Sequence, residues 1–379
     1  MNKVELVRKI HTTPTKLALA VAGGGAEVIG ELLRHGQGSN TVLEAIVPYC
    51  QKSFEGYIGG PPDKFVSEDT ACQLAMAAWQ RGMRLNETAD PVIGIGATCS
   101  LAKDNEREGR EHRVWIARQS NDKCVTLGFN VLANRETEET IVADAILNEV
   151  AIGCNLWTEA LSEGRTWQTY IVPKSVAEVF MGFANTSIGN SYPSGPRKLI
   201  FPGSFNPFHD GHIHMAKVAK EICPPEWKGE DRVYYEISIH NVDKPWLTYK
   251  AVFDRHKNYE AIKTDHTGIC FTNAPTFVQK AQVFPGCTFV VGYDTFVRIC
   301  DCKYYKDEHD RKACLKTLED ADVHWIVFPR KKADGTISTV EDVMKLPDVL
   351  TSRCLALDQA DHPHHNLSSS AIRSSNAKD

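Results

Sequence analysis

The stretch Leu199-Ile-Phe-Pro-Gly-Ser-Phe-Asn-Pro-Phe-His-Asp-Gly-His212 decides the fold. Its apolar start predicts a short buried strand that ends at a Pro-Gly pair, and the apolar spacing of residues 213–222 predicts a helix after it. A strand that breaks at glycine and continues as a helix leaves unpaired backbone N–H groups aimed at one point, which suits a phosphate. His209 and His212 lie three residues apart, so both imidazoles would face the same ligand.

Composition limits the class of protein. A chain of 379 residues predicts more than one domain. A net charge of -5, with scattered Lys and Arg, argues against a nucleic-acid partner. No apolar run has the length of a membrane span or of a signal peptide, so we expect a cytoplasmic protein, with the nucleus as an alternative, and no membrane contact. The twelve cysteines lack the two spaced pairs of a zinc site, so we predict thiols and no bound metal.

Two α/β domains joined by a linker are predicted. In residues 1–160 strands alternate with helices, and the turn at residues 119–122 indicates a hairpin. Residues 161–196 contain the Asn, Ser, Gly and Pro typical of a linker. Residues 197–379 repeat β–α units, which favours a Rossmann-like, doubly wound parallel sheet.

Two further motifs are expected near the first. Gly292-Tyr-Asp294 follows a predicted strand, and ligands of such sheets bind beyond the carboxyl ends of the strands. In Leu367-Ser-Ser-Ser-Ala-Ile-Arg373 the serines are helix N-caps by default. Their hydroxyl groups suit phosphate oxygens equally well, and Arg373, one turn further on, would bind a phosphate through its guanidinium.

Together the three motifs resemble the nucleotidylyltransferase superfamily with its His-x-Gly-His signature, over about residues 197–375. They are most similar to the nicotinamide mononucleotide adenylyltransferase branch. The resemblance implies an enzyme that transfers AMP from ATP to nicotinamide or nicotinate mononucleotide, releasing pyrophosphate and forming NAD or its deamido form. Mg²⁺ would accompany ATP. The alternatives are a related enzyme with another acceptor or with CTP as donor, and a nucleotide-binding regulator that has lost catalysis.

The resemblance also implies roles for single residues. His209, His212 and Arg373 would be catalytic, through contacts with phosphate oxygens. The nucleotide would be bound by Gly203, Ser204, Phe205, Asn206, Gly292, Asp294, Ser369 and Ser370. Substrate contacts are suggested for Lys244, Trp246 and Arg298, although an exposed lysine and a core tryptophan explain the first two equally well.

Residues 14–153 resemble another family, the CinA C-terminal domain, whose members include nicotinamide mononucleotide amidohydrolases. The similarity rests on a strand, a Gly-Gly pair and a helix in that order, and on Gly94-Ile-Gly96 and Asn134-Arg135 further on. The family's serine nucleophile lies in a Glu-Ser-Cys-Thr-Gly-Gly turn. Here the matching Ala20-Val-Ala-Gly-Gly-Gly25 contains no nucleophilic side chain.

We therefore expect the first domain to lack amidase activity. Thr98, Cys99 or Ser100 is an alternative nucleophile, but no base can be named for it. The domain would bind a nucleotide or form a homo-oligomer, as its family commonly does. The triple glycine also has a purely structural explanation, close packing of a helix on a sheet.

Overall fold

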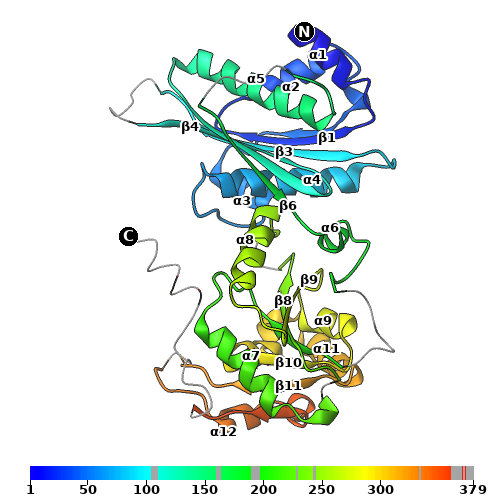
Figure 1. Ribbon diagram of the computed structural model, residues 1–379, viewed down its shortest axis with the longest axis vertical. Coiled ribbons are helices and arrows are strands. Elements are labelled where there is room, and N and C mark those ends of the chain that lie inside the picture. The colour runs from blue at the N-terminus through cyan, green and yellow to red at the C-terminus, as the bar shows by residue number, and fades with distance from the viewer. Residues whose placement is uncertain are drawn as a thin grey trace. The chain divides into compact units, whose positions relative to one another are not determined.

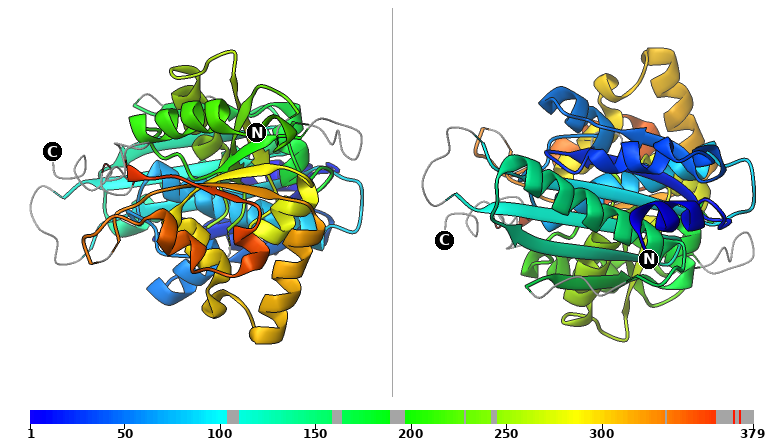
Figure 2. Two further views of the ribbon diagram at one scale, coloured as in Figure 1. Left: turned by 90° about the horizontal axis from the view of Figure 1, so that it is seen from below. Right: turned by 90° about the horizontal axis from the view of Figure 1, so that it is seen from above.

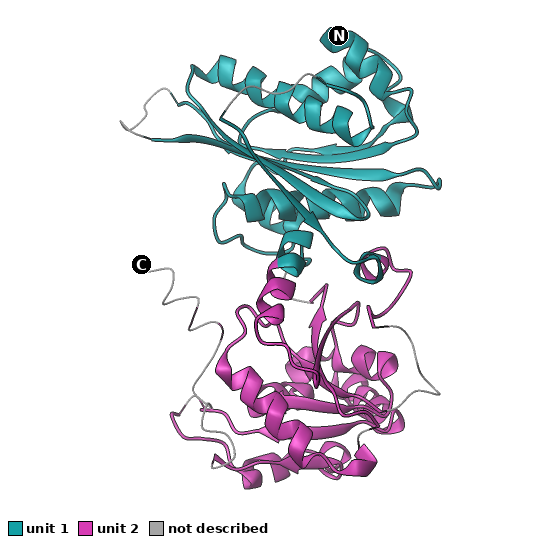
Figure 3. Cartoon of the chain, viewed as in Figure 1, with its two compact units in different colours: residues 1–177, 242–253 teal, residues 178–241, 254–379 magenta. Residues whose placement is uncertain are grey.

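The computed structural model describes residues 1–103, 110–158, 164–188, 197–227, 229–241, 245–332, 334–359, 369 and 372. The chain forms two compact units, shown in Figure 3. Unit 1 comprises residues 1–177 and 242–253, and unit 2 comprises residues 178–241 and 254–379. Two of the three divisions fall within α6 (Lys174–Phe180) and α8 (Tyr249–Glu260), and the third follows Asn241.

Unit 1 is a six-stranded sheet with helices on both faces (Figure 1). The strand order is β2-β1-β3-β4-β5-β6, with β1 parallel to β2 and β3, and antiparallel pairing from β3 to β6. The strands are β1 Lys16–Ala22, β2 Val42–Ile46, β3 Val92–Ser100, β4 His112–Gln119, β5 Lys123–Val131 and β6 Thr166–Ile171. The helices are α1 Lys3–Ile10, α2 Glu27–Arg34, α3 Gln51–Ile58, α4 Glu68–Leu85 and α5 Arg135–Gly153. The predicted hairpin is confirmed as β4 and β5.

The two faces of this sheet are packed differently. On one face, α1, α2 and α5 cover the main core of the unit, as the right view of Figure 2 shows. On the other face α4 runs along β3 so closely that a Cβ atom on Gly94 would lie 2.3 Å from the carbonyl oxygen of Ala75. Glycine in β3 is therefore required by close approach of the helix backbone. The Ser67 side chain caps α4 by accepting a hydrogen bond from the N–H of Thr70 at 3.2 Å.

Two segments outside the predicted first domain belong to unit 1. Residues 161–196, predicted as a linker, contain β6, which pairs with β5 at the edge of the sheet. The segment 242–253 supplies Tyr249, whose fully buried ring lies 6.4 Å from that of Trp79 and whose hydroxyl donates to the carbonyl oxygen of Asn121 at 2.6 Å.

Unit 2 contains the doubly wound sheet that the sequence predicts, with every neighbouring pair of strands parallel and the order β12-β11-β10-β7-β8-β9. Its strands are β7 Leu199–Pro202, β8 Val233–Ser238, β9 Thr267–Thr272, β10 Thr288–Gly292, β11 His324–Phe328 and β12 Cys354–Ala356. Its helices besides α8 are α7 Asp210–Ile222, α9 Phe277–Val283, α10 Tyr293–Cys300, α11 Glu308–Asp320, α12 Val340–Met344 and α13 Asp348–Thr351.

The helices of unit 2 cover both faces of its sheet, with α7 on one side and α11 on the other in the left view of Figure 2. One face packs Ile200, Phe289 and Trp325 against apolar residues of α9, α10 and α11. On the other face, Phe201 meets the ring of His212 from α7, at 5.9 Å between centroids. The mixed α/β fold class is thus confirmed.

Two observations bear on the composition. Within the described ranges, no helix combines the length and the apolar character of a membrane span. None of the twelve cysteines, all of which lie in described residues, forms a disulfide bond.

Candidate active site

The strand order of unit 2 reverses between β7 and β10, and we call the region beyond the carboxyl ends of these two strands the crevice. The chain moves from β7 to β8 and β9 on one side, and then returns to build β10, β11 and β12 on the other. In doubly wound sheets ligands bind where the order reverses, beyond the carboxyl ends of the strands. The loop at residues 203–209 follows β7, and Gly292 ends β10, so both predicted motifs flank this crevice.

The loop after β7 is held by its own aromatic side chains. Phe205 is buried, with 1% of its surface exposed, and stacks on Phe208 at 4.7 Å between ring centroids. A Cβ atom on Gly203 would lie 2.7 Å from the Phe205 ring, so only glycine fits here. The predicted nucleotide contact Phe205 therefore directs its side chain into the core. Ser204 and Asn206 of this loop are exposed.

Main-chain hydrogen bonds fix the same loop. The N–H of Gly203, predicted as a phosphate donor, is donated to the carbonyl oxygen of Glu236 in β8 at 2.9 Å. Arg255, which the sequence analysis missed, donates from Nε to the carbonyl oxygen of Ser204 at 2.9 Å and is itself buried. These bonds give the loop a fixed shape before any ligand arrives.

The two predicted histidines lie together at the start of α7. His209 is the N-cap residue and His212 occupies the first turn, and their rings stack at 3.6 Å between centroids with planes 23° apart. The N–H of His209 donates to Nδ1 of His212 at 3.3 Å. In a neutral imidazole with Nδ1 as acceptor, the proton resides on Nε2. His212 can thus offer an Nε2–H donor to a ligand.

The surroundings of His212 keep it neutral. Burial, then the neighbouring His209 and then Arg330 lower its pKa from the usual 6.5 to about 3. Near neutral pH the ring is therefore a hydrogen-bond donor without charge. A positive charge that stabilises a bound phosphate would have to come from a group other than His212.

Asp294 and Arg330 lie at the next strand ends. Asp294, in the first turn of α10, keeps 57% of its side chain exposed, and its Oδ1 is 3.9 Å from Nε of Arg330. Arg330 follows β11 by two residues, and its side chain is 20% exposed. This arginine was not among the predicted site residues, although the rule that located Gly292 and Asp294 at a strand end applies to it equally.

The last motif reaches the loop through one described residue. Ser369 donates from Oγ to the carbonyl oxygen of Pro207 at 3.0 Å, which brings the far end of the chain to the loop after β7. Ser370, Arg373 and Lys244 lie outside the described residues. Arg298 is exposed in the last turn of α10, and Trp246 is half-buried in the segment that belongs to unit 1.

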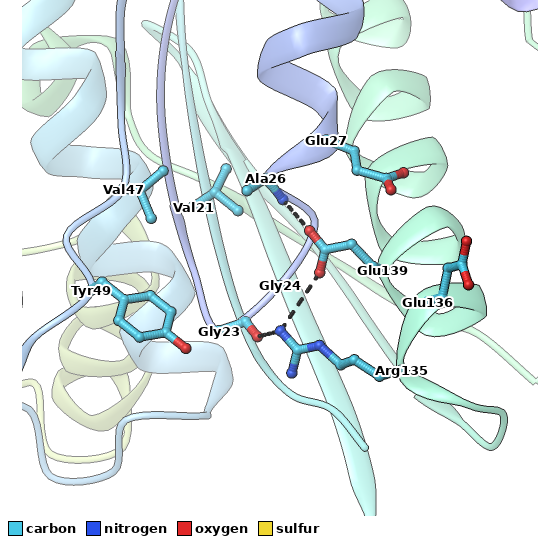
Figure 4. Close-up of a pocket in the computed structure, with 10 residues that line it drawn as sticks. All are labelled: Val21, Gly23, Gly24, Ala26, Glu27, Val47, Tyr49, Arg135, Glu136 and Glu139. Atoms are coloured by element: carbon cyan, nitrogen blue, oxygen red, sulfur yellow. Dashed lines mark hydrogen bonds and ion pairs between the residues drawn. The ribbon is translucent and has the colours of Figure 1, made fainter. Parts of the chain in front are cut away.

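Unit 1 contains a pocket of about 360 Å³ at its own glycine turn, shown in Figure 4. From α5, Glu139 accepts the N–H of Ala26 at 2.7 Å, and Arg135 donates to the carbonyl oxygen of Gly23 at 3.0 Å. Three glutamates and one arginine line the pocket: Glu27, Glu136, Glu139 and Arg135.

The alternative nucleophiles lie in β3, where each has a hydrogen-bond partner or a raised pKa. Burial and then Glu139 raise the pKa of Cys99 to about 12, so it stays a thiol near neutral pH. The hydroxyl of Thr98 donates to the carbonyl oxygen of Phe65 at 2.7 Å, and that of Ser100 accepts from Arg110 at 2.6 Å. The absence of amidase activity stays a prediction that this geometry favours.

Comparisons with known proteins agree with the geometry of unit 2. Residues 200–375 match the Cytidylyltransferase-like family. A Schizosaccharomyces pombe protein named for nicotinamide mononucleotide adenylyltransferase is 30% identical over 119 residues, which are 29% of this chain and 44% of that protein. A Desulfotalea psychrophila protein named for nicotinate-nucleotide adenylyltransferase is 25% identical over 130 residues, 28% of this chain and 56% of that protein. The chain thus spans about half the length of these relatives.

Solved structures of another family are similar to the N-terminal part of the chain. They include the competence/damage inducible protein CihA from Agrobacterium tumefaciens, with 19% identity and a TM-score of 0.32. A CinA superfamily protein from Klebsiella pneumoniae has 17% identity and a TM-score of 0.33. Each comparison covers 41% of this chain and 97% of the other.

Proposed function

We propose that unit 2 is a nucleotidylyltransferase that transfers AMP from ATP to nicotinamide or nicotinate mononucleotide, with release of pyrophosphate. The family match over residues 200–375 and the names of the two relatives support the reaction class and a place in NAD synthesis. Both mononucleotides stand as acceptors because one relative is named for each.

One observation carries the proposal, the stacked pair of His209 and His212 at the switch point of the sheet. Two imidazoles at the start of a 13-residue helix, beyond the carboxyl end of a central parallel strand, form a site for a phosphate group. Because Nδ1 of His212 accepts a main-chain hydrogen bond, Nε2–H is the ring donor that would serve a ligand.

The proposed reaction requires little proton transfer. A phosphate oxygen of the mononucleotide forms a bond to the α-phosphorus of ATP, and the bond from that phosphorus to the oxygen bridging to the β-phosphate breaks. Its electron pair leaves with pyrophosphate. Such transfers are accelerated mainly by positioning and by stabilisation of the developing charge. His209 and His212 would donate hydrogen bonds to the phosphate oxygens on which that charge develops.

Magnesium would arrive as part of the substrate, MgATP. Mg²⁺ is usually held by one or two carboxylates together with substrate phosphates. Among the described residues no group of three or more metal-ligating side chains gathers, whereas the exposed Asp294 lies at the crevice. This donor set fits an ion carried by the triphosphate. Ser369 donates its hydroxyl proton to the carbonyl oxygen of Pro207, so it would position the closing motif at the loop, and Ser370 and Arg373 would bind the outer phosphates.

The test is pyrophosphate release by the full-length protein with MgATP and a panel of acceptors: nicotinamide mononucleotide, nicotinate mononucleotide and phosphopantetheine. We expect turnover with one or both of the first two, and a kcat at least about 100-fold lower in His212→Ala. The control is His266→Ala, because His266 is exposed and directly precedes β9, at the amino-terminal edge of the sheet. It should match the wild type.

Other outcomes would redirect or refute the proposal. Turnover with phosphopantetheine alone, or with CTP in place of ATP, would assign a different substrate pair. Pyrophosphate release that persists in His212→Ala would remove the histidine pair from the mechanism. A wild-type protein that binds MgATP without turnover on any acceptor would indicate a nucleotide-binding regulator.

A further inference from the structure

Arg330 is fixed at the edge of the crevice by a short hairpin after β11. Its N–H donates to Oγ of Ser338 at 2.9 Å, and its carbonyl oxygen accepts the N–H of Ser338 at 2.9 Å. Lys331 and Ile337 form the next bridge of the hairpin, and Ser338 is buried. Both bonds use the main chain of Arg330 and fix it just beyond the end of β11.

The guanidinium lies over the end of the neighbouring strand. A Cβ atom on Gly292 would lie 2.9 Å from Nε of Arg330 and 3.2 Å from its Cγ, so the arginine runs directly across the glycine. The Oδ1 of Asp294 is 3.9 Å from the same Nε. Because β10 pairs with both β7 and β11, this position borders the crevice that contains His212.

The Asp294 side of this ion pair is open to solvent, with 57% of the side chain exposed. An ion pair with a solvent-exposed carboxylate is worth little and is screened by salt. Arg330, in contrast, is mostly buried, and burial lowers its pKa. Its positive charge also acts on His212, where it contributes to the low pKa of that ring. The charge of Arg330 is therefore effective inside the crevice.

We propose that Arg330 is a catalytic residue of the transfer reaction, whose guanidinium binds the phosphate oxygens that gain charge as pyrophosphate leaves. The inference rests on the proposed function and extends it. His212 supplies a hydrogen bond without charge, and Arg330 would add a positive charge at the same place. A planar guanidinium suits this task, because it binds two phosphate oxygens at once.

The experiment compares the full-length wild type with Arg330→Gln, Arg330→Lys and the control Arg232→Gln. Arg232 is exposed and precedes β8, at the opposite edge of the sheet. We expect kcat to fall about 100- to 1,000-fold in Arg330→Gln, with a smaller change in the KM for ATP. Binding of inorganic pyrophosphate, measured by calorimetry, should weaken at least about 10-fold. The control should match the wild type in both measurements.

Several results would overturn this role. If the wild type turns over and Arg330→Gln stays within about threefold of its kcat, the role of Arg330 fails while the proposed function stands. An inactive Arg330→Gln that binds pyrophosphate as the wild type does would exclude a phosphate contact. A wild type without turnover on any acceptor refutes the proposed function, and the role of Arg330 with it.

A second variant guards against misfolding. Circular dichroism and the melting temperature should show Arg330→Gln folded, because the Ser338 bonds do not involve the side chain. Arg330→Lys keeps the cation without its planar fork, so we expect a kcat between those of the wild type and Arg330→Gln. If Arg330→Lys is folded but no more active than Arg330→Gln, the positive charge of residue 330 does not accelerate the reaction.

Discussion

One strand–glycine–helix turn from each unit can be compared, and the two differ in what occupies the start of the helix. In unit 1, β1 leads through Gly23 to α2, and the N–H of Ala26 at that helix start is bound by the carboxylate of Glu139. In unit 2, β7 leads through Gly203 to α7, whose start holds two imidazoles. At the same kind of turn, unit 1 thus binds the carboxylate of its own Glu139, whereas unit 2 presents two imidazoles that suit the phosphate of a ligand.

Charge extends this contrast. The turn of unit 1 faces three glutamates and one arginine, so an incoming phosphate would meet net negative charge. The turn of unit 2 faces a neutral His212 and the cation of Arg330. A helix start alone does not make a phosphate site, because the side chains around it decide whether a phosphate is admitted.

The largest loss of stability is expected when the aromatic packing of the loop after β7, in unit 2, is removed. Phe205→Ala removes a fully buried ring stacked on Phe208, and we expect it to lower the free energy of unfolding by about 3–5 kcal/mol. Urea denaturation measures the loss. Phe183→Ala is the control, since Phe183 is 76% exposed and should change stability by no more than about 0.5 kcal/mol. Equal losses would contradict a turn held by buried aromatic residues.

The turn of unit 1 between β1 and α2 depends on backbone geometry instead. Gly23 has φ +89°, and a Cβ atom there would lie 2.0 Å from the carbonyl oxygen of Cys99. Gly23→Ala should therefore cost about 2–4 kcal/mol, from the positive φ together with the clash. Gly36→Ala separates the two causes, because Gly36 has φ +78° with open space around it and should cost only about 1 kcal/mol. A Gly23→Ala variant as stable as Gly36→Ala would show that the clash is relieved.

A pH profile tests the neutral state of His212. Its pKa of about 3 lies below the unfolded value near 6.5, so as the pH falls below 6.5 the unfolded chain takes up a proton that the folded protein refuses. Stability is complete above pH 6.5 and declines toward pH 3. Between pH 7 and pH 4.5 we expect His212 to account for about 2–3 kcal/mol of the loss. His212→Asn, measured by urea denaturation at both pH values, should lose correspondingly less than the wild type. A variant with the same pH dependence would place the pKa of His212 near its usual value.

The smallest loss of stability is expected when the charge of Glu139 is removed. Glu139→Gln keeps a hydrogen-bond acceptor for Ala26 but removes the charge at the start of α2, so we expect a loss of about 0.3–1 kcal/mol. Glu136→Gln is the matched control, because Glu136 is exposed and lines the same pocket. A larger loss in the control would indicate that the pocket, and not the helix start, requires the negative charge.

The arrangement of the second turn could be predicted from the sequence because it depends on local pattern. A strand, a glycine and a helix follow one another, and parallel strands bring their carboxyl ends to one edge, which located His209, His212 and Asp294. The inward side chain of Phe205 was not predicted, because a phenylalanine in a polar loop gives no sign of which way it faces.

Other features depend on contacts between distant parts of the chain. Arg330 lies in the basic run Pro329-Arg-Lys-Lys332, which has the composition of a solvated loop. The strand-end rule applies to it, but its place beside Gly292 depends on β11 pairing with β10, which the sequence does not give. β6 escaped prediction because most of its side chains are exposed, so it lacks the alternating apolar pattern of a half-buried strand. No local signal assigns residues 242–253 to unit 1, because their partners lie more than a hundred residues earlier.

The place of Tyr249 in unit 1 has a consequence for dissecting the protein. A gene fragment ending before residue 197 would encode all the strands of the sheet of unit 1. It would lack Tyr249, whose ring packs beside Trp79 and whose hydroxyl donates to the carbonyl oxygen of Asn121. We expect such a fragment to melt earlier than the same segment in the whole protein. Exchange of whole domains during evolution would face the same loss, since unit 1 consists of two separate segments of the chain and no single cut separates the units.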